Sequence, residues 1–130
     1  MEFVGKTPDK VHGTLHWNRG GHQQKGGNLA VKQPWADFHV YAVEWSADTI
    51  DFFFDETKYH SVALSAADDG DKNAFRKPHY LKLNLALGGD WGGKIDDSIF
   101  PQKFVIDYVR VYERVAGAVG PSPPPSARKP

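Results

Sequence analysis

The 130-residue chain contains no cysteine, which excludes disulfide bonds, thiolate nucleophiles and cysteine-based zinc sites. It also has no excess charge of either sign, because 16 Lys and Arg balance 16 Asp and Glu. Without a basic surface, neither a nucleic acid nor an anionic membrane is an expected partner. No apolar run reaches the roughly 18 residues of a membrane span, and the first residues lack the basic start and apolar stretch of a signal peptide.

Aromatic residues, in contrast, are abundant: the chain has four Trp, five Tyr and eight Phe. Part of this reflects strand propensity, because aromatic side chains suit a pleated, half-buried surface. Sugar binding would also use them, since aromatic rings stack on the apolar faces of pyranoses. For any single ring, packing in a sandwich core is the favoured interpretation.

Short alternating apolar segments separated by turn residues predict an all-β fold with about six strands. The residues between two of these segments, near Asp55–Lys58, predict a hairpin turn. We expect loops over residues 17–32, 63–73 and 88–100, because Gly, Asn, Gln and Asp are concentrated there. After about residue 115 the composition becomes rich in proline and predicts an extended spacer. The expected strands are residues 11–17, 38–45, 49–55, 59–64, 80–87 and 104–112.

Two features invite a metal hypothesis. His12 and His16 are four residues apart, but on a strand this spacing covers about 13 Å, which is too far for one ion. Asp107 lies among valines in an expected strand, where a carboxylate must be paired or bound to a cation. From the residues alone, a salt bridge to Arg110 or Arg114 is favoured over a cation site that uses Asp107 with backbone carbonyls.

Three long segments, in order, resemble glycoside hydrolase family 16, the laminarinase-like β-glucanases. They are ADFHVYAVEWSADTIDFFFDETKYHSV, FRKPHYLKLNLALGGDWGG and FPQKFVIDYVRVYE. They are similar to the family's paired strands, to its stretch PFYLILNLAVGGNWPG and to its closing strand. The resemblance runs from Glu2 to about Glu113 and looks like the C-terminal half of the family domain.

The family's catalytic motif reads E-[I/L]-D-[I/V]-M-E, in which the first Glu is the nucleophile and the last is the acid/base. The resemblance places Glu2 at the acid/base position, with the nucleophile and the middle Asp expected before the chain begins. Glu44 and Asp90 are conceivable substitutes for the nucleophile, although nothing in their spacing to Glu2 recommends them. One carboxylate cannot perform both steps of a retaining mechanism.

The resemblance also implies roles for other residues. His16 and Trp17 are similar to residues that line the cleft, and Asn84 and Trp91 to residues of its floor and rim. Each has a structural alternative: packing for Trp17, the strand ladder for Asn84, and anchoring of a loop for Trp91. Asp107 matches a calcium ligand on the convex face, which makes a structural calcium the expectation there.

The implied fold is a concanavalin-like jelly-roll β-sandwich of two antiparallel sheets, present as an incomplete half in residues 1–115, with residues 116–130 as a Pro-rich tail. The implied activity is retaining hydrolysis of β-1,3- or mixed 1,3-1,4-glucan outside the cell, with no cofactor needed for chemistry. Two alternatives stay open. One is a carbohydrate-binding sandwich without catalysis, and the other is an incomplete chain that needs a complementing N-terminal fragment.

Overall fold

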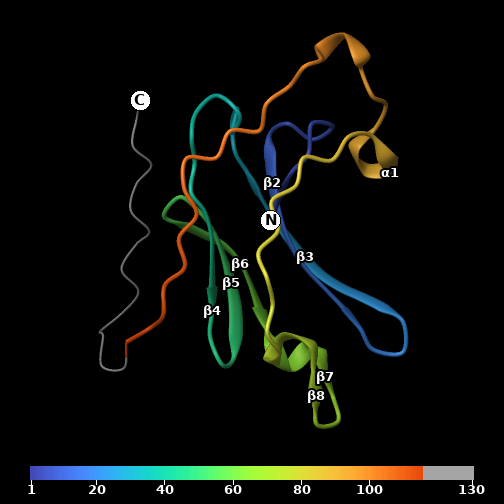
Figure 1. The fold of residues 1–130 in the computed structure, drawn as a ribbon. Helices are drawn as coiled ribbons and strands as arrows, with labels where there is room; N and C mark the ends of the chain where they lie inside the picture. The colour runs from blue at the N-terminus through green and yellow to red at the C-terminus, as the bar shows by residue number, and fades with distance from the viewer. Residues whose placement is uncertain (116–130) are drawn as a thin grey trace.

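The computed structural model describes residues 1–115, and the predicted Pro-rich tail lies outside these residues. Every strand pairing is antiparallel, which confirms the predicted all-β class. One sheet has the order β1-β2-β3 and the second has the order β4-β5-β6, and Figure 1 labels the strands from β2 onward. The strands are β1 (Glu2–Phe3), β2 (Lys10–Asn18), β3 (His22–Ala30), β4 (Tyr41–Trp45), β5 (Thr49–Phe54), β6 (Thr57–Ala63) and a small hairpin of β7 (Asp68–Asp69) with β8 (Lys72–Asn73). The helical segments are α1 (Gly89–Gly92) and the 3₁₀ turns Leu64–Ala67, Ala74–Arg76 and Asp97–Ile99.

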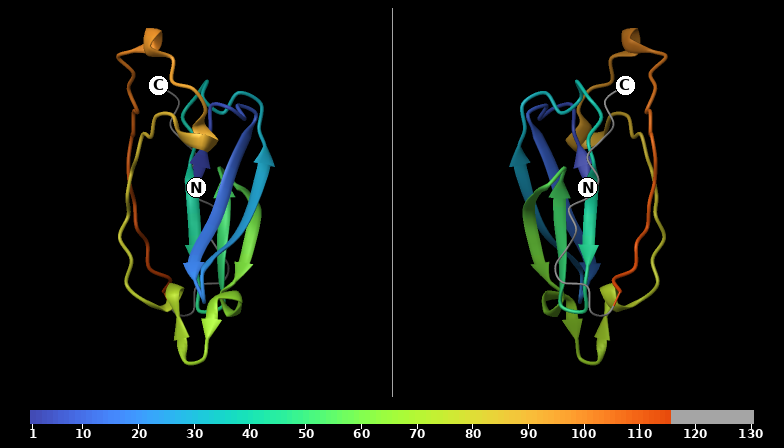
Figure 2. Two further views of the ribbon diagram at one scale, coloured as in Figure 1. Left: turned by 90° about the vertical axis from the view of Figure 1, so that its right-hand side faces the viewer. Right: turned by 90° about the vertical axis from the view of Figure 1, so that its left-hand side faces the viewer.

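The two sheets pack face to face, as the side views in Figure 2 show. Gly13 on β2 and Gly27 on β3 are paired across the strands and lie where the sheets approach most closely. A Cβ at Gly13 would lie 2.7 Å from the Phe52 ring, and a Cβ at Gly27 would lie 2.6 Å from the His60 ring. The lack of a side chain at both positions therefore makes room for rings from the second sheet.

A β-bulge in the second sheet directs two consecutive residues toward the first sheet. Phe52 pairs with His60 and Phe53 pairs with Lys58, which leaves Tyr59 as the extra residue of β6. The Tyr59 and His60 rings both contact Phe52, with ring centroids 6.2 and 5.5 Å apart. The bulge thus supplies the two polar rings that fill the space over the paired glycines.

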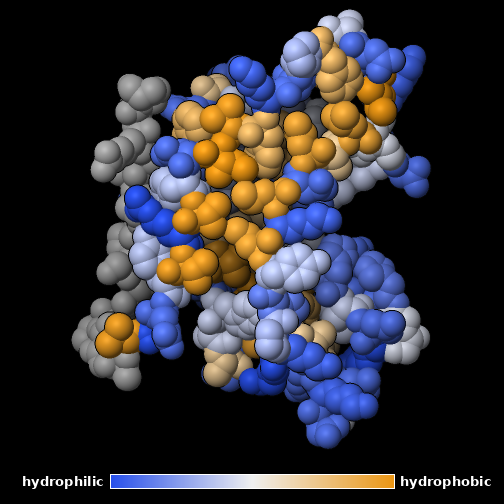
Figure 3. Space-filling view, viewed as in Figure 1, coloured by the Kyte–Doolittle hydropathy of each residue, from blue (hydrophilic) through white to orange (hydrophobic). Residues whose placement is uncertain are grey.

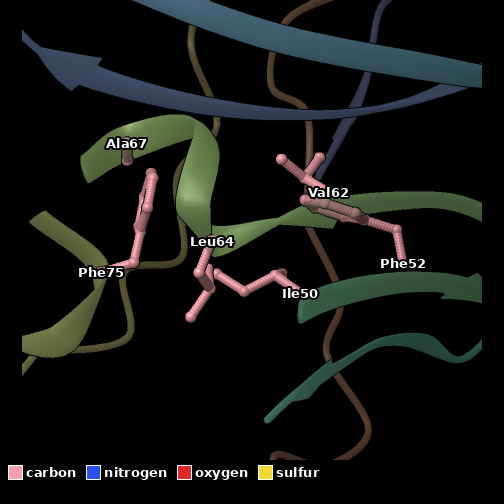
Figure 4. Packing of buried hydrophobic residues seen from close by; sticks show 6 residues of the cluster. All are labelled: Ile50, Phe52, Val62, Leu64, Ala67 and Phe75. Atoms are coloured by element: carbon pink, nitrogen blue, oxygen red, sulfur yellow. The ribbon is translucent and has the colours of Figure 1, made fainter. Parts of the chain in front are cut away.

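The buried core lies at one end of the sandwich, where β5 and β6 meet the first two 3₁₀ turns (Figure 4). Asn73 is buried in this region and joins the turns, because its side-chain amide donates to the Leu64 carbonyl at 2.7 Å. Its side-chain oxygen accepts from the Phe75 amide at 2.8 Å. Both ends of the side chain are therefore satisfied. The core cluster consists of Ile50, Phe52, Val62, Leu64, Ala67 and Phe75.

The predicted hairpin turn is confirmed. Phe54 pairs with Thr57, so the loop between β5 and β6 is Asp55-Glu56, with Asp55 in the left-handed region at φ 50°. The Asp55 carboxylate accepts from the Val40 amide at 2.9 Å and lies 2.8 Å from His39 Nδ1. This carboxylate consequently holds the segment that leads into β4 against the turn.

The loop expected over residues 17–32 is wrong over most of its length, because β3 occupies residues 22–30. All nine of its residues pair with β2, from Asn18 with His22 to Lys10 with Ala30. Its Gly, Asn and Gln residues are typical of loops, but packing against the second sheet requires glycine at position 27. Tertiary packing therefore overrides local propensity here.

The strands expected over residues 80–87 and 104–112 are also wrong. Both segments are without regular secondary structure, and in Figure 2 they run beside the sandwich, apart from its sheets. A strand is defined by its hydrogen-bonded neighbour, and the described residues provide none for either segment. The alternating leucines are each more than half exposed, and Figure 3 shows apolar side chains gathered on this face. The exposed set includes Leu81, Leu83, Leu85, Leu87, Val105, Val109 and Val111.

Candidate active site

Glu2 lies opposite His12 in the pairing of β1 with β2. Residues directly opposite each other share a face of the sheet, so Glu2, His12 and His16 all point to the face directed away from the second sheet. Both Glu2 and His16 are exposed on this face. The carboxylate predicted to be the acid/base thus stands on an open surface that also carries imidazoles.

Trp91 covers one end of this surface. Its ring meets the His12 ring edge-on, with centroids 5.1 Å apart and an interplanar angle of 75°. The other side of His12 is held by Thr7, whose Oγ1 lies 3.1 Å from His12 Nε2. The structure therefore brings Trp91 to the strand pair that carries Glu2, with half of its indole exposed.

The backbone around Trp91 is shaped by glycine. The single turn α1 is bounded by Gly88 at φ 69° and Gly93 at φ 88°, in a region that disfavours residues with a Cβ. A Cβ at Gly88 would also lie 2.9 Å from the Ile95 side chain. The GGDWGG sequence is therefore what allows this loop to fold back over β2.

Trp17 lies on the opposite face of β2 from Glu2 and His16. Its ring packs edge-on against Phe75 at 6.0 Å between centroids and belongs to the residues around the core. The strand alternation that exposes His16 necessarily turns Trp17 inward. The structure thus places Trp17 against the core and not on the surface that carries Glu2.

Asn84 is exposed within the unpaired segment 80–87. This segment runs apart from β1 in Figure 2, so the structure does not bring Asn84 together with Glu2.

Asp107 is likewise exposed, in the unpaired segment 104–112. No group of three or more His, Cys, Asp or Glu side chains within residues 1–115 is arranged to hold a metal ion. Calcium prefers six to eight oxygen ligands. Asp107 and the other residues of 1–115 therefore do not by themselves supply the ligands of the expected calcium site. Neither a salt bridge from Asp107 nor a calcium site is present among them.

A second carboxylate on the Glu2 face is missing from the sheet, since β1, β2 and β3 contain no other Asp or Glu. Glu44 pairs with Asp51 on the outward face of the second sheet, where Lys58 Nζ lies 3.3 Å from the Asp51 carboxylate. The sandwich thus separates Glu44 from Glu2. Asp90, the other substitute considered for the nucleophile, directly precedes Trp91 in α1.

Sequence reasoning missed His12 as part of this surface and considered it only as a metal ligand. Its even spacing from His16 on an alternating strand was the available signal, because it predicts a shared face. The contacts of His12 with Thr7 and Trp91 could not be predicted, since they depend on the loops.

The sequence profile described as "Glycosyl hydrolases family 16" matches residues 1–110. The chain belongs to this family. It is 40% identical to the Beta-glucanase of Rhodothermus marinus over 88% of its own length, and 38% identical to the Glucan endo-1,3-beta-glucosidase A1 of Niallia circulans over 87%. The family-16 relationship confirms the resemblance and the glycoside hydrolase class, in which catalysis needs no cofactor.

A solved structure supports the same conclusion about the fold. It comes from work on endo-acting O-glycanases of the human gut microbiota that initiate mucin breakdown. The match has a TM-score of 0.53 at 28% identity, covers 58% of this chain and 29% of the other, and agrees with a partial jelly-roll.

The family-16 chain spans 43% of the length of the Rhodothermus relative and 18% of the Niallia relative. Within residues 1–115, no helix is long and apolar enough to cross a membrane.

Proposed function

We propose that this chain carries the acid/base of a retaining endo-β-glucanase that acts on β-1,3- or mixed 1,3-1,4-glucan. The observation that supports this most strongly is the position of Glu2, exposed on an open sheet face opposite His12, whose ring contacts Trp91. The names of the relatives, a beta-glucanase and a glucan endo-1,3-beta-glucosidase, support the substrate class.

In this proposal Glu2 first donates its proton to the glycosidic oxygen while a second carboxylate attacks the anomeric carbon. Glu2 then takes a proton from the water that releases the sugar from the covalent intermediate. The two carboxyl groups must lie about 5–5.5 Å apart. Since β1, β2 and β3 provide no partner for Glu2, we place the nucleophile on a complementing N-terminal polypeptide.

The same complementing polypeptide would supply strands for the unpaired segments. Trp91 would stack on a sugar ring, and His16 would hydrogen-bond sugar hydroxyls along the surface. Asn84 would join them once the segment 80–87 is paired, and Asp107 would reach its calcium ligands in the same completed domain. We place the activity outside the cell, where glucan polymers are found.

A chimaera tests this function. Residues 1–113 replace the matched segment of the Rhodothermus marinus beta-glucanase, and reducing ends are measured on laminarin and on mixed-linkage glucan. We expect cleavage, and a loss of about 10²–10⁴-fold for Glu2→Gln, because general acid–base catalysis contributes that much. Glu44→Gln is the matched control, since Glu44 lies on the outward face of the second sheet. Unchanged activity of the Glu2→Gln chimaera would contradict the assignment.

Glucan binding without cleavage is the second candidate for the chain by itself. The lack of a second carboxylate in β1, β2 and β3 favours it, while the exposed Trp91 provides a ring for stacking. The isolated chain should then retain laminarin on an affinity gel and release no reducing ends. Cleavage by the isolated chain would exclude this candidate.

A further inference from the structure

Two histidines beside the turn of the β2–β3 hairpin lie closer together than any other pair of imidazoles that the structure describes. His16 Nδ1 is 3.0 Å from His22 Nε2, and the two rings are stacked with centroids 5.3 Å apart and 15° between their planes. Both side chains are exposed on the face that carries Glu2. This pair is distinct from His12 and its contacts with Thr7 and Trp91.

The hairpin fixes this arrangement through its register. His16 is opposite Gln24 and His22 is opposite Asn18, so the two histidines are diagonal neighbours across the strands. Diagonal neighbours on one face are within reach of long or aromatic side chains. The turn is defined as well, because Gly20 and Gly21 have φ 64° and 137° and the Gly21 amide donates to Asn18 Oδ1 at 3.0 Å.

We propose that His16 and His22 form a two-histidine site for a divalent transition-metal ion, with His16 Nδ1 and His22 Nε2 as ligands. Imidazole nitrogens bind such ions at about 2.0–2.1 Å. The two nitrogens now share a hydrogen bond of 3.0 Å, and an ion that replaces the shared proton can bind both as neighbouring ligands of a square-planar or octahedral site.

The identity of the ion follows from ligand chemistry. Two imidazoles completed by water suit the tetragonal geometry that Cu²⁺ and Ni²⁺ favour. Cu²⁺ also has the highest affinity of the divalent first-row metals. No third His, Cys, Asp or Glu joins the pair within residues 1–115, so water fills the remaining positions on the exposed side. The site should therefore bind Cu²⁺ more tightly than Ni²⁺.

Titration of the full 130-residue chain with CuCl₂ in a non-coordinating buffer tests the proposal by calorimetry and electron paramagnetic resonance. We expect one strong site with nitrogen splittings from two imidazoles. His16→Gln and His22→Gln should each weaken it by at least about tenfold, since even loss of an outer-sphere partner costs about that much.

His79→Gln is the control, because His79 is an exposed histidine that packs against Phe75 and Trp45, away from this hairpin. Circular dichroism melts of all variants establish that each is folded. Equal Cu²⁺ affinity in the wild type and both hairpin variants, or no strong site in the wild type, would overturn the proposal. The readout is metal binding itself, so it does not depend on whether the chain cleaves glucan.

Discussion

At the scale of single residues, Gly13 and Gly27 set the distance between the two sheets. Each is a position where a Cβ would enter the volume of a ring from the second sheet. Interior packing leaves little space to absorb such an overlap. These two residues therefore help to determine how closely β2 and β3 lie on β5 and β6.

We predict that Gly27→Ala lowers the free energy of unfolding by about 1–3 kcal/mol, because the added methyl group overpacks the interface against His60. Denaturant unfolding followed by circular dichroism measures this change. Gly5→Ala is the control, since no atom lies within 4 Å of a Cβ there. Equal stability of the two variants would mean that the sheets are farther apart than described.

Tyr59 gives a prediction about pH. Burial, with a smaller contribution from nearby Tyr41, raises the pKa of Tyr59 to about 12. The unfolded chain loses this proton near pH 10 and the folded chain only near pH 12. The folded state thus binds more protons between these values, and stability falls as the pH rises from about 10 to 12.

Ultraviolet titration should therefore show a late-ionising tyrosine in the wild type that is missing in Tyr59→Phe. Among residues 1–115 the buried Tyr59 hydroxyl has no hydrogen-bond partner, so the same variant should be at least as stable as the wild type at neutral pH. A strong loss of stability in Tyr59→Phe would show that the hydroxyl has a partner.

At the scale of elements, the sequence was sufficient for β2, β4, β5, β6 and the turn at Asp55, where alternation and turn chemistry agree with the packing. β3 was missed because Gly27 is needed to make room for the His60 ring of the opposite sheet, which local strand propensity does not show. The segments 80–87 and 104–112 have the alternation of strands but no neighbour to pair with among residues 1–115. Periodicity predicts which face a residue takes, and it does not supply a hydrogen-bonding partner.

Hydrogen exchange tests this difference between elements. Backbone amides of residues 80–87 and 104–112 should exchange rapidly, close to the rate of an open chain, whereas amides of β2 and β5 should be protected by their ladders. The experiment needs dilute protein, because exposed apolar segments favour self-association. Slow exchange in both segments at every concentration would contradict the description of these segments as unpaired.

At the scale of the whole molecule, the candidate site could be predicted only in part. The family resemblance implied roles for Glu2, Trp91 and Trp17 in one cleft; the structure places Trp91 against His12, opposite Glu2, and β2 turns Trp17 toward Phe75. His12 is held on this surface by Thr7 and Trp91, which come from two different loops. Contacts between a strand and distant loops depend on the complete fold, so local sequence patterns could not show them.

The proton-donor role of Glu2 is tested most directly by comparing two substrates in the chimaera. Glu2→Gln should reduce kcat/KM on laminarin by about 10²–10⁴-fold, but much less on an aryl β-glucoside whose phenolate leaves without protonation. This selective loss is the result we predict. An equal loss on both substrates, or no loss on laminarin, would contradict the assignment of Glu2 as the general acid.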